Sequence, residues 1–241
     1  MKKILLASLL LCCALPLLAG ETGCVYGVKG PAEIMRAGSG EWRPALKGSP
    51  LAEGDRIKTG SGSCEILFKD GTFIKMEKES ETAIETLRAT KEERFFSFSF
   101  LRGKALWMAA RIKGKTASRF SVRTPSAVCA VRGTDFSVIV SSDGESTVGL
   151  FEGKVAVSGR SAEEELLSGQ ELSSYPGGLK VRERLSRLMK AEERRYAKVK
   201  GRVESLRKRL AEREAFIDDY INRQRKTIED FDARRKARLN K

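Results

Sequence analysis

Between Val25 and Ser174, short apolar stretches recur at intervals of about eight to twelve residues, separated by residues that favour turns. The clearest pair is 64–68 and 73–76, because Asp70-Gly71 lies between them and Asp-Gly favours the positive φ angles of a tight hairpin turn. In 96–100, Phe and Ser alternate, which places the Phe side chains on one face of a strand. The sequence therefore predicts a mainly β fold over residues 25–175, either a sandwich or a short solenoid-like β-roll.

The remainder of the chain, residues 180–241 after Pro176-Gly177-Gly178, predicts a long α-helix. Apolar residues recur there at steps of three and four, and Gly201 is the single glycine, with no proline. The narrow apolar stripe is typical of a coiled coil or of a helix that lies on a partner, although charged residues such as Glu192 interrupt it. We expect this region to self-associate or to bind a protein partner.

Residues 1–20 have the pattern of a secretory signal peptide. Lys2 and Lys3 precede the apolar run Ile4–Leu18, which is shorter than the roughly 20 residues that span a bilayer, and small residues follow at Ala19-Gly20. An uncleaved N-terminal anchor is the alternative. No later segment is apolar enough to span a membrane, so we expect no transmembrane helix in the mature chain and localisation in the periplasm or at the cell surface.

The positive charge is concentrated in the C-terminal helix. The chain carries 46 Lys and Arg against 32 Asp and Glu, a formal net charge of +14, and residues 180–241 hold 22 of the basic and 11 of the acidic residues. An anionic membrane or cell-wall surface is therefore a second candidate partner for this helix, in a structural envelope protein. Nucleic acid is not expected as a partner, because the predicted export removes the chain from it.

Three cysteines follow the predicted leader. Thr22-Gly23-Cys24 is similar to the end of a lipoprotein box, although Glu21 stands where an apolar residue belongs, so Cys24 is a candidate for lipidation. Cys64 and Cys129 could form a disulfide if their strands lie side by side with Cα atoms within about 7 Å. They could equally be small buried hydrophobic residues.

The chain contains no histidine, which excludes Ser-His-Asp and Cys-His catalysis and His-ligated zinc. Asp135 and Glu152, with Lys154 near the latter, are the carboxylates that could serve acid–base chemistry, but nothing in their spacing brings them together. The sequence has no phosphate-binding loop, no Cys-x-x-Cys and no Asp-rich calcium loop. We expect no enzymatic activity, no cofactor and no metal site.

Ordered blocks of sequence run through the β region. They are Leu51-Ala52-Glu53-Gly54-Asp55-Arg56-Ile57-Lys58-Thr59-Gly60, Phe68 with Asp70-Gly71-Thr72, Leu101-Arg102-Gly103-Lys104-Ala105, Phe120 to Ala127, Val131-Arg132-Gly133-Thr134-Asp135-Phe136, Phe151-Glu152-Gly153-Lys154-Val155 and Leu167-Ser168-Gly169-Gln170. In this order they resemble the FecR domain, the periplasmic module of bacterial cell-surface signalling regulators. The resemblance covers residues 25–175 and implies a non-catalytic binding or scaffolding role, with extracytoplasmic signal sensing as one expected contribution.

Regulators of this family carry a sigma-factor-binding segment and one transmembrane helix ahead of this module. The sequence shows neither, so the resemblance leaves us expecting no direct contact with a sigma factor.

Most residues of these blocks have a structural interpretation. We expect the glycines to lie at turns or close backbone approaches, namely Gly54, Gly60, Gly71, Gly133, Gly153 and Gly169. Asp55 and Asp70 are expected to bond turn backbones, and Thr124-Pro125 to lead in extended form into a bend. Thr59, Thr134, Phe136 and Glu152 complete the set of motif residues. Arg132 has two interpretations, either a tie between neighbouring turns or an anion-binding residue at a recognition surface.

Overall fold

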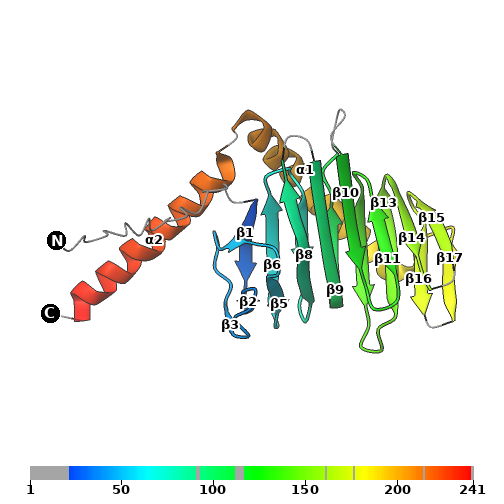
Figure 1. The fold of residues 1–241 in the computed structure, drawn as a ribbon, viewed down its shortest axis with the longest axis horizontal. Coiled ribbons are helices and arrows are strands. Elements are labelled where there is room, and N and C mark those ends of the chain that lie inside the picture. The colour runs from blue at the N-terminus through cyan, green and yellow to red at the C-terminus, as the bar shows by residue number, and fades with distance from the viewer. Residues whose placement is uncertain are drawn as a thin grey trace, which may run out of the picture.

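The computed structural model describes residues 22–90, 93–111, 117–160, 162–175, 177–213 and 215–239. Residues 1–20, predicted to be a signal peptide, and Pro176 lie outside the described residues. The fold consists of two β-sheets and two C-terminal helices (Figure 1), and the mainly β prediction is confirmed. No helix among the described residues holds a stretch apolar enough to cross a membrane.

Sheet A has the strand order β4-β1-β6-β7-β9-β12-β13-β16-β17, in which β9 comprises Glu93–Met108. Its own strands are β1 (Gly23–Lys29), β4 (Pro50–Leu51), β6 (Ser63–Phe68), β7 (Phe73–Met76), β12 (Asp135–Val140), β13 (Ser146–Glu152), β16 (Glu171–Tyr175) and β17 (Gly178–Arg182). All of these pairings are antiparallel. The chain thus builds this sheet from segments far apart in sequence.

Sheet B has the order β3-β2-β5-β8-β9-β10-β11-β14-β15, and its one parallel pair is β9 with β10. Its own strands are β2 (Ala32–Met35), β3 (Trp42–Pro44), β5 (Arg56–Thr59), β8 (Glu81–Ala89), β10 (Ala117–Arg123), β11 (Val128–Val131), β14 (Lys154–Ser158) and β15 (Glu163–Leu167). The chain adds one or two strands to one sheet and then crosses to the other, as in a short solenoid-like roll.

Strand β9 (Glu93–Met108) belongs to both sheets. Its first half pairs with β8 and β10 in sheet B, and its second half, from Gly103, pairs with β7 and β12 in sheet A. Gly103 has a φ of +89°, and a Cβ there would collide with Ser80, so only glycine fits where the strand changes sheet.

Aromatic side chains fill the space between the sheets. Phe96, Phe98 and Phe100 all point into it, as the alternating pattern predicts, and each is at most 1% exposed. Trp107 stacks on Phe136 with ring centroids 6.3 Å apart. This core joins the two sheets through large, fully buried aromatic side chains.

The helical region differs from the prediction in two respects. The stretch predicted as one helix forms α1 (Arg187–Glu212) and α2 (Phe216–Leu239), with a break at Arg213, whose φ and ψ are −146° and 96°. The break lets Phe216 and Ile217 pack on sheet A, and Asp218 and Asp219 occupy the first turn of α2, where carboxylates favour the helix dipole.

Strand pairing in sheet A continues through the glycine-rich stretch that precedes the helices. Gly177 lies in the turn between two paired strands and Gly178 begins the second of them, because β17 continues sheet A beyond β16. Helix α1 then begins after Ser186, whose hydroxyl accepts a hydrogen bond from the Met189 N–H at 3.3 Å.

Candidate functional site: the helix-docking face of sheet A

Helix α1 lies across the outer face of sheet A, and the start of α2 extends this contact to β1 (Figure 1). We call the second apolar cluster that joins helices and sheet the docking cluster. Its buried members are Cys24, Leu67, Phe73, Leu106, Met108, Tyr196, Val203, Leu206, Phe216, Ile217 and Ile221. The apolar stripe of α1, which predicts a coiled coil or a partner surface, is therefore covered by the chain's own sheet.

Two close approaches shape this contact. Gly149 on β13 lies under Met189, and a Cβ at that glycine would come within 2.7 Å of the Met189 Sδ. Phe151, on the same strand, stacks on Tyr196 with ring centroids 5.3 Å apart. Glu192, which interrupts the predicted stripe, is buried beside Lys104 of β9 at 2.9 Å.

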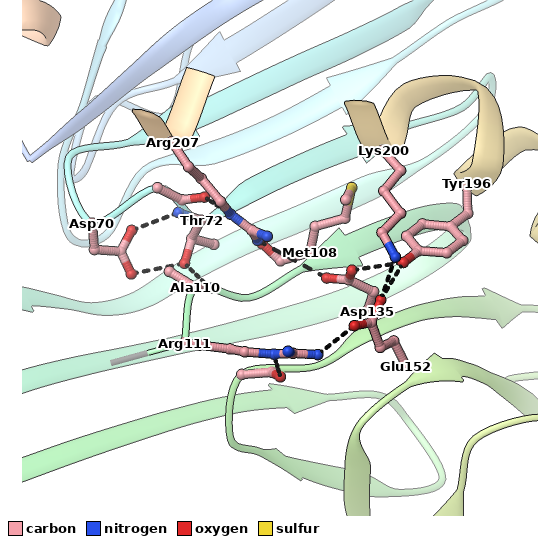
Figure 2. Close-up of polar contacts among 12 residues, drawn as sticks. Asp70, Thr72, Met108, Ala110, Arg111, Asp135, Glu152, Tyr196, Lys200 and Arg207 are labelled. Atoms are coloured by element: carbon pink, nitrogen blue, oxygen red, sulfur yellow. Dashed lines mark hydrogen bonds and ion pairs between the residues drawn. The ribbon is translucent and has the colours of Figure 1, made fainter. Parts of the chain in front are cut away.

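A polar network lies within the docking face (Figure 2). Asp135 on β12 and Glu152 on β13 are register partners, so the sheet brings together two carboxylates that their sequence spacing leaves apart. The Tyr196 hydroxyl lies 3.0 Å from Asp135 Oδ2 and 2.8 Å from Glu152 Oε2. Lys200 Nζ donates to Glu152 Oε2 at 2.7 Å, and Arg111 Nη2 donates to Oε1 at 2.6 Å. We call these five residues, with Arg207, the docking network.

Arg207 ties α1 to the Asp70-Gly71 hairpin. Its Nε donates to the Gly71 carbonyl at 3.0 Å and its Nη2 to the Met108 carbonyl at 2.9 Å. Gly71 has a φ of +86°, and a Cβ there would lie 2.9 Å from the Arg207 Cγ, so this glycine serves both the turn and the approach of the helix.

The surroundings shift the pKa values of the network in opposite directions. The hydrogen bond from Lys200, followed by that from Tyr196, lowers the pKa of Glu152 to about 2. Burial raises the pKa of Asp135, although Arg207 opposes the shift. Burial, with the hydrogen bond to Glu152, raises the pKa of Tyr196 and keeps the phenol neutral. The network thus consists of ion pairs and hydrogen bonds that hold the helix on the sheet, and its two carboxylates do not form an open acid–base pair.

We expect Glu152 to make helix docking sensitive to acid. Its folded-state pKa lies below the ordinary value of 4.5, so its contribution to stability is complete above pH 4.5 and is lost as pH falls towards about 2. Asp135, with a raised pKa, acts in the opposite direction. Urea unfolding at several acidic pH values should show that the free energy of unfolding falls less steeply with decreasing pH in Glu152→Gln than in wild type. The exposed Glu193→Gln should keep the wild-type slope, and an unchanged slope in Glu152→Gln would contradict this assignment.

We expect Tyr196→Phe to lower the free energy of unfolding by about 1–3 kcal/mol, because it leaves the buried Asp135 without its phenol partner. Chemical denaturation at neutral pH measures the change. Tyr175→Phe removes the same hydroxyl from a side chain that is 38% exposed and should change stability by less than about 0.5 kcal/mol. Equal effects of the two variants would show that the network does not hold the helix.

The motif residues predicted to be structural lie at turns and in buried hydrogen bonds. Gly54, Gly71, Gly133, Gly153 and Gly169 have positive φ angles, while a Cβ on Gly60 would lie 3.2 Å from Pro31. Asp55 accepts hydrogen bonds from the Ala52 N–H and from Arg36, and Asp70 accepts from the N–H and the hydroxyl of Thr72. Thr59 donates to the Glu77 carbonyl, and Thr124, ahead of Pro125, donates to the Ala127 carbonyl across the bend. Phe136 is fully buried, and Thr134 is buried with a hydroxyl that has no hydrogen-bond partner among the described residues.

Arg132 is exposed, and its side chain makes no hydrogen bond or ion pair with a described residue. It does not tie neighbouring turns together. Arg111 does this instead, since its Nε donates to the Gly133 carbonyl at 3.2 Å while its other end holds Glu152. Lys154 does not join the carboxylate pair and forms an ion pair with Glu165 at 2.8 Å.

The three described cysteines are all buried. Cys64 on β6 and Cys129 on β11 are buried free thiols, and their strands are not neighbours in either sheet, so no disulfide joins them. Burial raises the pKa of each thiol to about 12. Cys24 is fully buried on β1 in the docking cluster, and its lipidation stays a prediction.

Sequence reasoning missed four of the basic or phenolic residues that matter most. Arg94, Arg111, Tyr196 and Arg207 stand outside the ordered blocks and carry no local signal of their role. The sequence offered one general hint. The carboxylates of the blocks, Asp70, Asp135 and Glu152, need cationic or hydroxyl partners once they are buried, so residues elsewhere in the chain had to supply these partners.

One comparison with known proteins agrees with the motifs described above. The family model described as FecR protein matches residues 55–156. No curated protein matches the chain. Two crystal structures of a candidate anti-sigma factor from Parabacteroides distasonis ATCC 8503, at 1.65 and 2.50 Å resolution, are each 22% identical to this chain with a TM-score of 0.45. The similarity covers 54% of this chain and 59% of theirs, so the chain spans less than two thirds of that protein. The resemblance of the ordered blocks to the FecR domain is therefore confirmed by the family model over residues 55–156.

Proposed function

We propose that this chain is an exported, non-catalytic FecR-domain protein of the bacterial cell envelope, which binds a protein partner and contributes to extracytoplasmic signalling. The family match supports a regulatory role. The observation that carries the proposal is the docking network, in which motif residues of sheet A hold an amphipathic helix through Asp135 and Glu152. This face is occupied by the chain's own helix, and its carboxylates are engaged by Tyr196 and Lys200 of that helix, which supports a non-catalytic role.

Export can be tested directly. The full chain, produced in a Gram-negative host, should appear in the periplasmic fraction with a mass that lacks about the first 20 residues. A variant that begins after residue 20 should stay in the cytoplasm. Retention of the full chain in the cytoplasm would contradict the proposal.

The far end of α2 is the second part of the proposal, as the surface for self-association or for a partner. Gln224 of α2 still lies against Gly48, and the far end of the helix extends away from the sheets (Figure 1). Ile228 and Phe231, three residues apart on this helix, are 39% and 67% exposed. An exposed apolar pair at this spacing is typical of a helix that pairs with another.

We therefore expect a chain truncated after Gln224 to sediment as a monomer at concentrations where the full chain forms an oligomer. The truncation leaves the docking cluster intact, whereas removal of residues 180–241 would uncover it. Ile228→Glu should act like the truncation, and Thr227→Glu on the exposed flank of the same helix should not. A full chain that is monomeric at all concentrations would contradict self-association, and the far end of α2 would then have to bind a different protein.

The alternative function is a structural envelope protein that binds anionic surfaces. It is favoured by the exposed cations of the same helix end, Arg223, Arg225, Lys226 and Arg234. This function predicts co-sedimentation of the full chain with vesicles rich in phosphatidylglycerol, and release by salt. Oligomers that ignore such vesicles would favour protein binding, and vesicle-bound monomers would favour the alternative.

A further inference from the structure

The outer face of sheet B carries an ordered polar surface at β8, β9 and β10. The register places Arg88 and Arg119 on either side of Phe95, one on each neighbouring strand. Cross-strand partners point to the same face of a sheet, and adjacent strands lie about 4.8 Å apart, so the two arginines flank the ring within about 10 Å of each other. We call this row with its neighbours the sheet B platform.

The next row of the platform is made of hydroxyl groups. Thr86, Ser97 and Ser121 are register partners, and the Ser121 hydroxyl donates to the Ser97 Oγ at 3.1 Å. Ser97 in turn donates to Glu85 at 2.8 Å. Arg123 stands one row further, 3.6 Å from the same carboxylate. These residues line a hollow of about 510 Å³ on the sheet.

The platform holds more positive charge than it neutralises. Arg88 and Arg119 are exposed and make no ion pair with a described residue, and Glu85 is the acidic group paired with Arg123. The part of the chain that the structure describes therefore gives these two arginines, on either side of a half-buried aromatic ring, no ion-pair partner within the fold. Phe95 is also an apolar side chain on the outer face of the sheet, where the solenoid core does not need it.

We propose that the sheet B platform binds an acidic glycan. In this assignment the guanidinium groups of Arg88 and Arg119 bind carboxylate or phosphate groups of the polymer, the Phe95 ring packs against a sugar ring, and the hydroxyl row bonds sugar hydroxyls. A single aromatic residue favours a glycan over single-stranded nucleic acid, which uses successive stacking positions. The site is separate from the docking face, which lies on the other sheet.

Titration calorimetry of the full chain with a short oligogalacturonate tests the proposal. We expect binding that weakens as salt is added and at least about tenfold lower affinity for Arg88→Glu/Arg119→Glu. Phe95→Ala should also weaken binding, because it removes the ring contact. A control, Lys180→Glu/Arg209→Glu, makes the same charge change at exposed positions elsewhere and should bind like wild type.

Other ligands decide between sources of the anionic group. Inorganic polyphosphate that binds as tightly as the oligogalacturonate would assign the site to phosphate-bearing polymers. No binding of any acidic glycan, equal binding of a neutral oligosaccharide, tighter binding of polyglutamate or of single-stranded DNA, or an equal loss in the control variant would each overturn the proposal. Circular dichroism monitors folding, and Arg119→Gln replaces the double variant if that one unfolds.

Discussion

Replacing Arg94 with methionine is expected to lower the free energy of unfolding by about 3–5 kcal/mol, because it removes one partner of a buried ion pair. The side chains of Arg94 and Asp70 are 2% and 10% exposed, and Arg94 Nη1 lies 2.5 Å from Asp70 Oδ2. The same nitrogen donates to the Ala110 carbonyl at 3.2 Å. Methionine keeps the apolar volume of the side chain but leaves Asp70 buried without its cation.

A double-mutant cycle separates the ion pair from the packing. Arg94 also lies over two rings of the core, with its guanidinium carbon 5.5 Å from the Phe96 centroid and 5.7 Å from that of Phe120. We expect Arg94→Met/Asp70→Asn to cost less than the sum of the single variants, measured by urea unfolding. Strictly additive costs would show that the ion pair contributes nothing beyond the packing of each side chain.

Val203→Asp is expected to detach both helices from sheet A. Val203 is fully buried in the docking cluster, and an unpaired carboxylate there should cost about 3–5 kcal/mol. The two-sheet core does not include Val203, so the sheets should stay folded while their outer face becomes accessible. Hydrogen exchange should then accelerate in α1 and α2 and remain slow in the inner strands.

Ser205→Asp provides the matched control, since it places the same carboxylate on an exposed position of α1. It should change neither hydrogen exchange nor the melting temperature appreciably. If Val203→Asp instead unfolded the sheets together with the helices, the helices and the strand body would form one cooperative unit.

The sheets could be predicted from sequence because their signals are local. The alternation of Phe96, Phe98 and Phe100 and the Asp70-Gly71 turn depend on residues that are close neighbours in the chain. The extent of sheet A could not be predicted, since Gly177 and Gly178 favour a turn whether a hairpin or a linker follows.

The docking face could not be predicted for a different reason. An amphipathic stripe indicates that a helix has an apolar partner but does not say whether that partner is another chain or its own sheet. The apolar surface of the sheet that α1 contacts is made of Leu67, Phe73, Leu106 and Met108. These residues point outward from strands whose inward neighbours already complete a core. Only the three-dimensional order of those strands assembles the surface.

The docking network shows the same limit for charged residues. Asp135 and Glu152 are separated by a hairpin, and Tyr196 by a further stretch of chain, so no spacing rule links them. Arg132 is the converse case, because the residues around it suggest a buried role and the side chain is exposed. A guanidinium beside a turn can point to either side of the backbone, and its neighbour Gly133 is held by Arg111 instead.

The single strand β9 is shared by both sheets, and this has a mechanical consequence. A load applied to either layer passes along one continuous backbone into the other, so the layers cannot separate at that strand unless β9 loses its pairing in one of the sheets. Tethered in an optical trap by strands of opposite sheets, the body should therefore yield in one abrupt event rather than layer by layer.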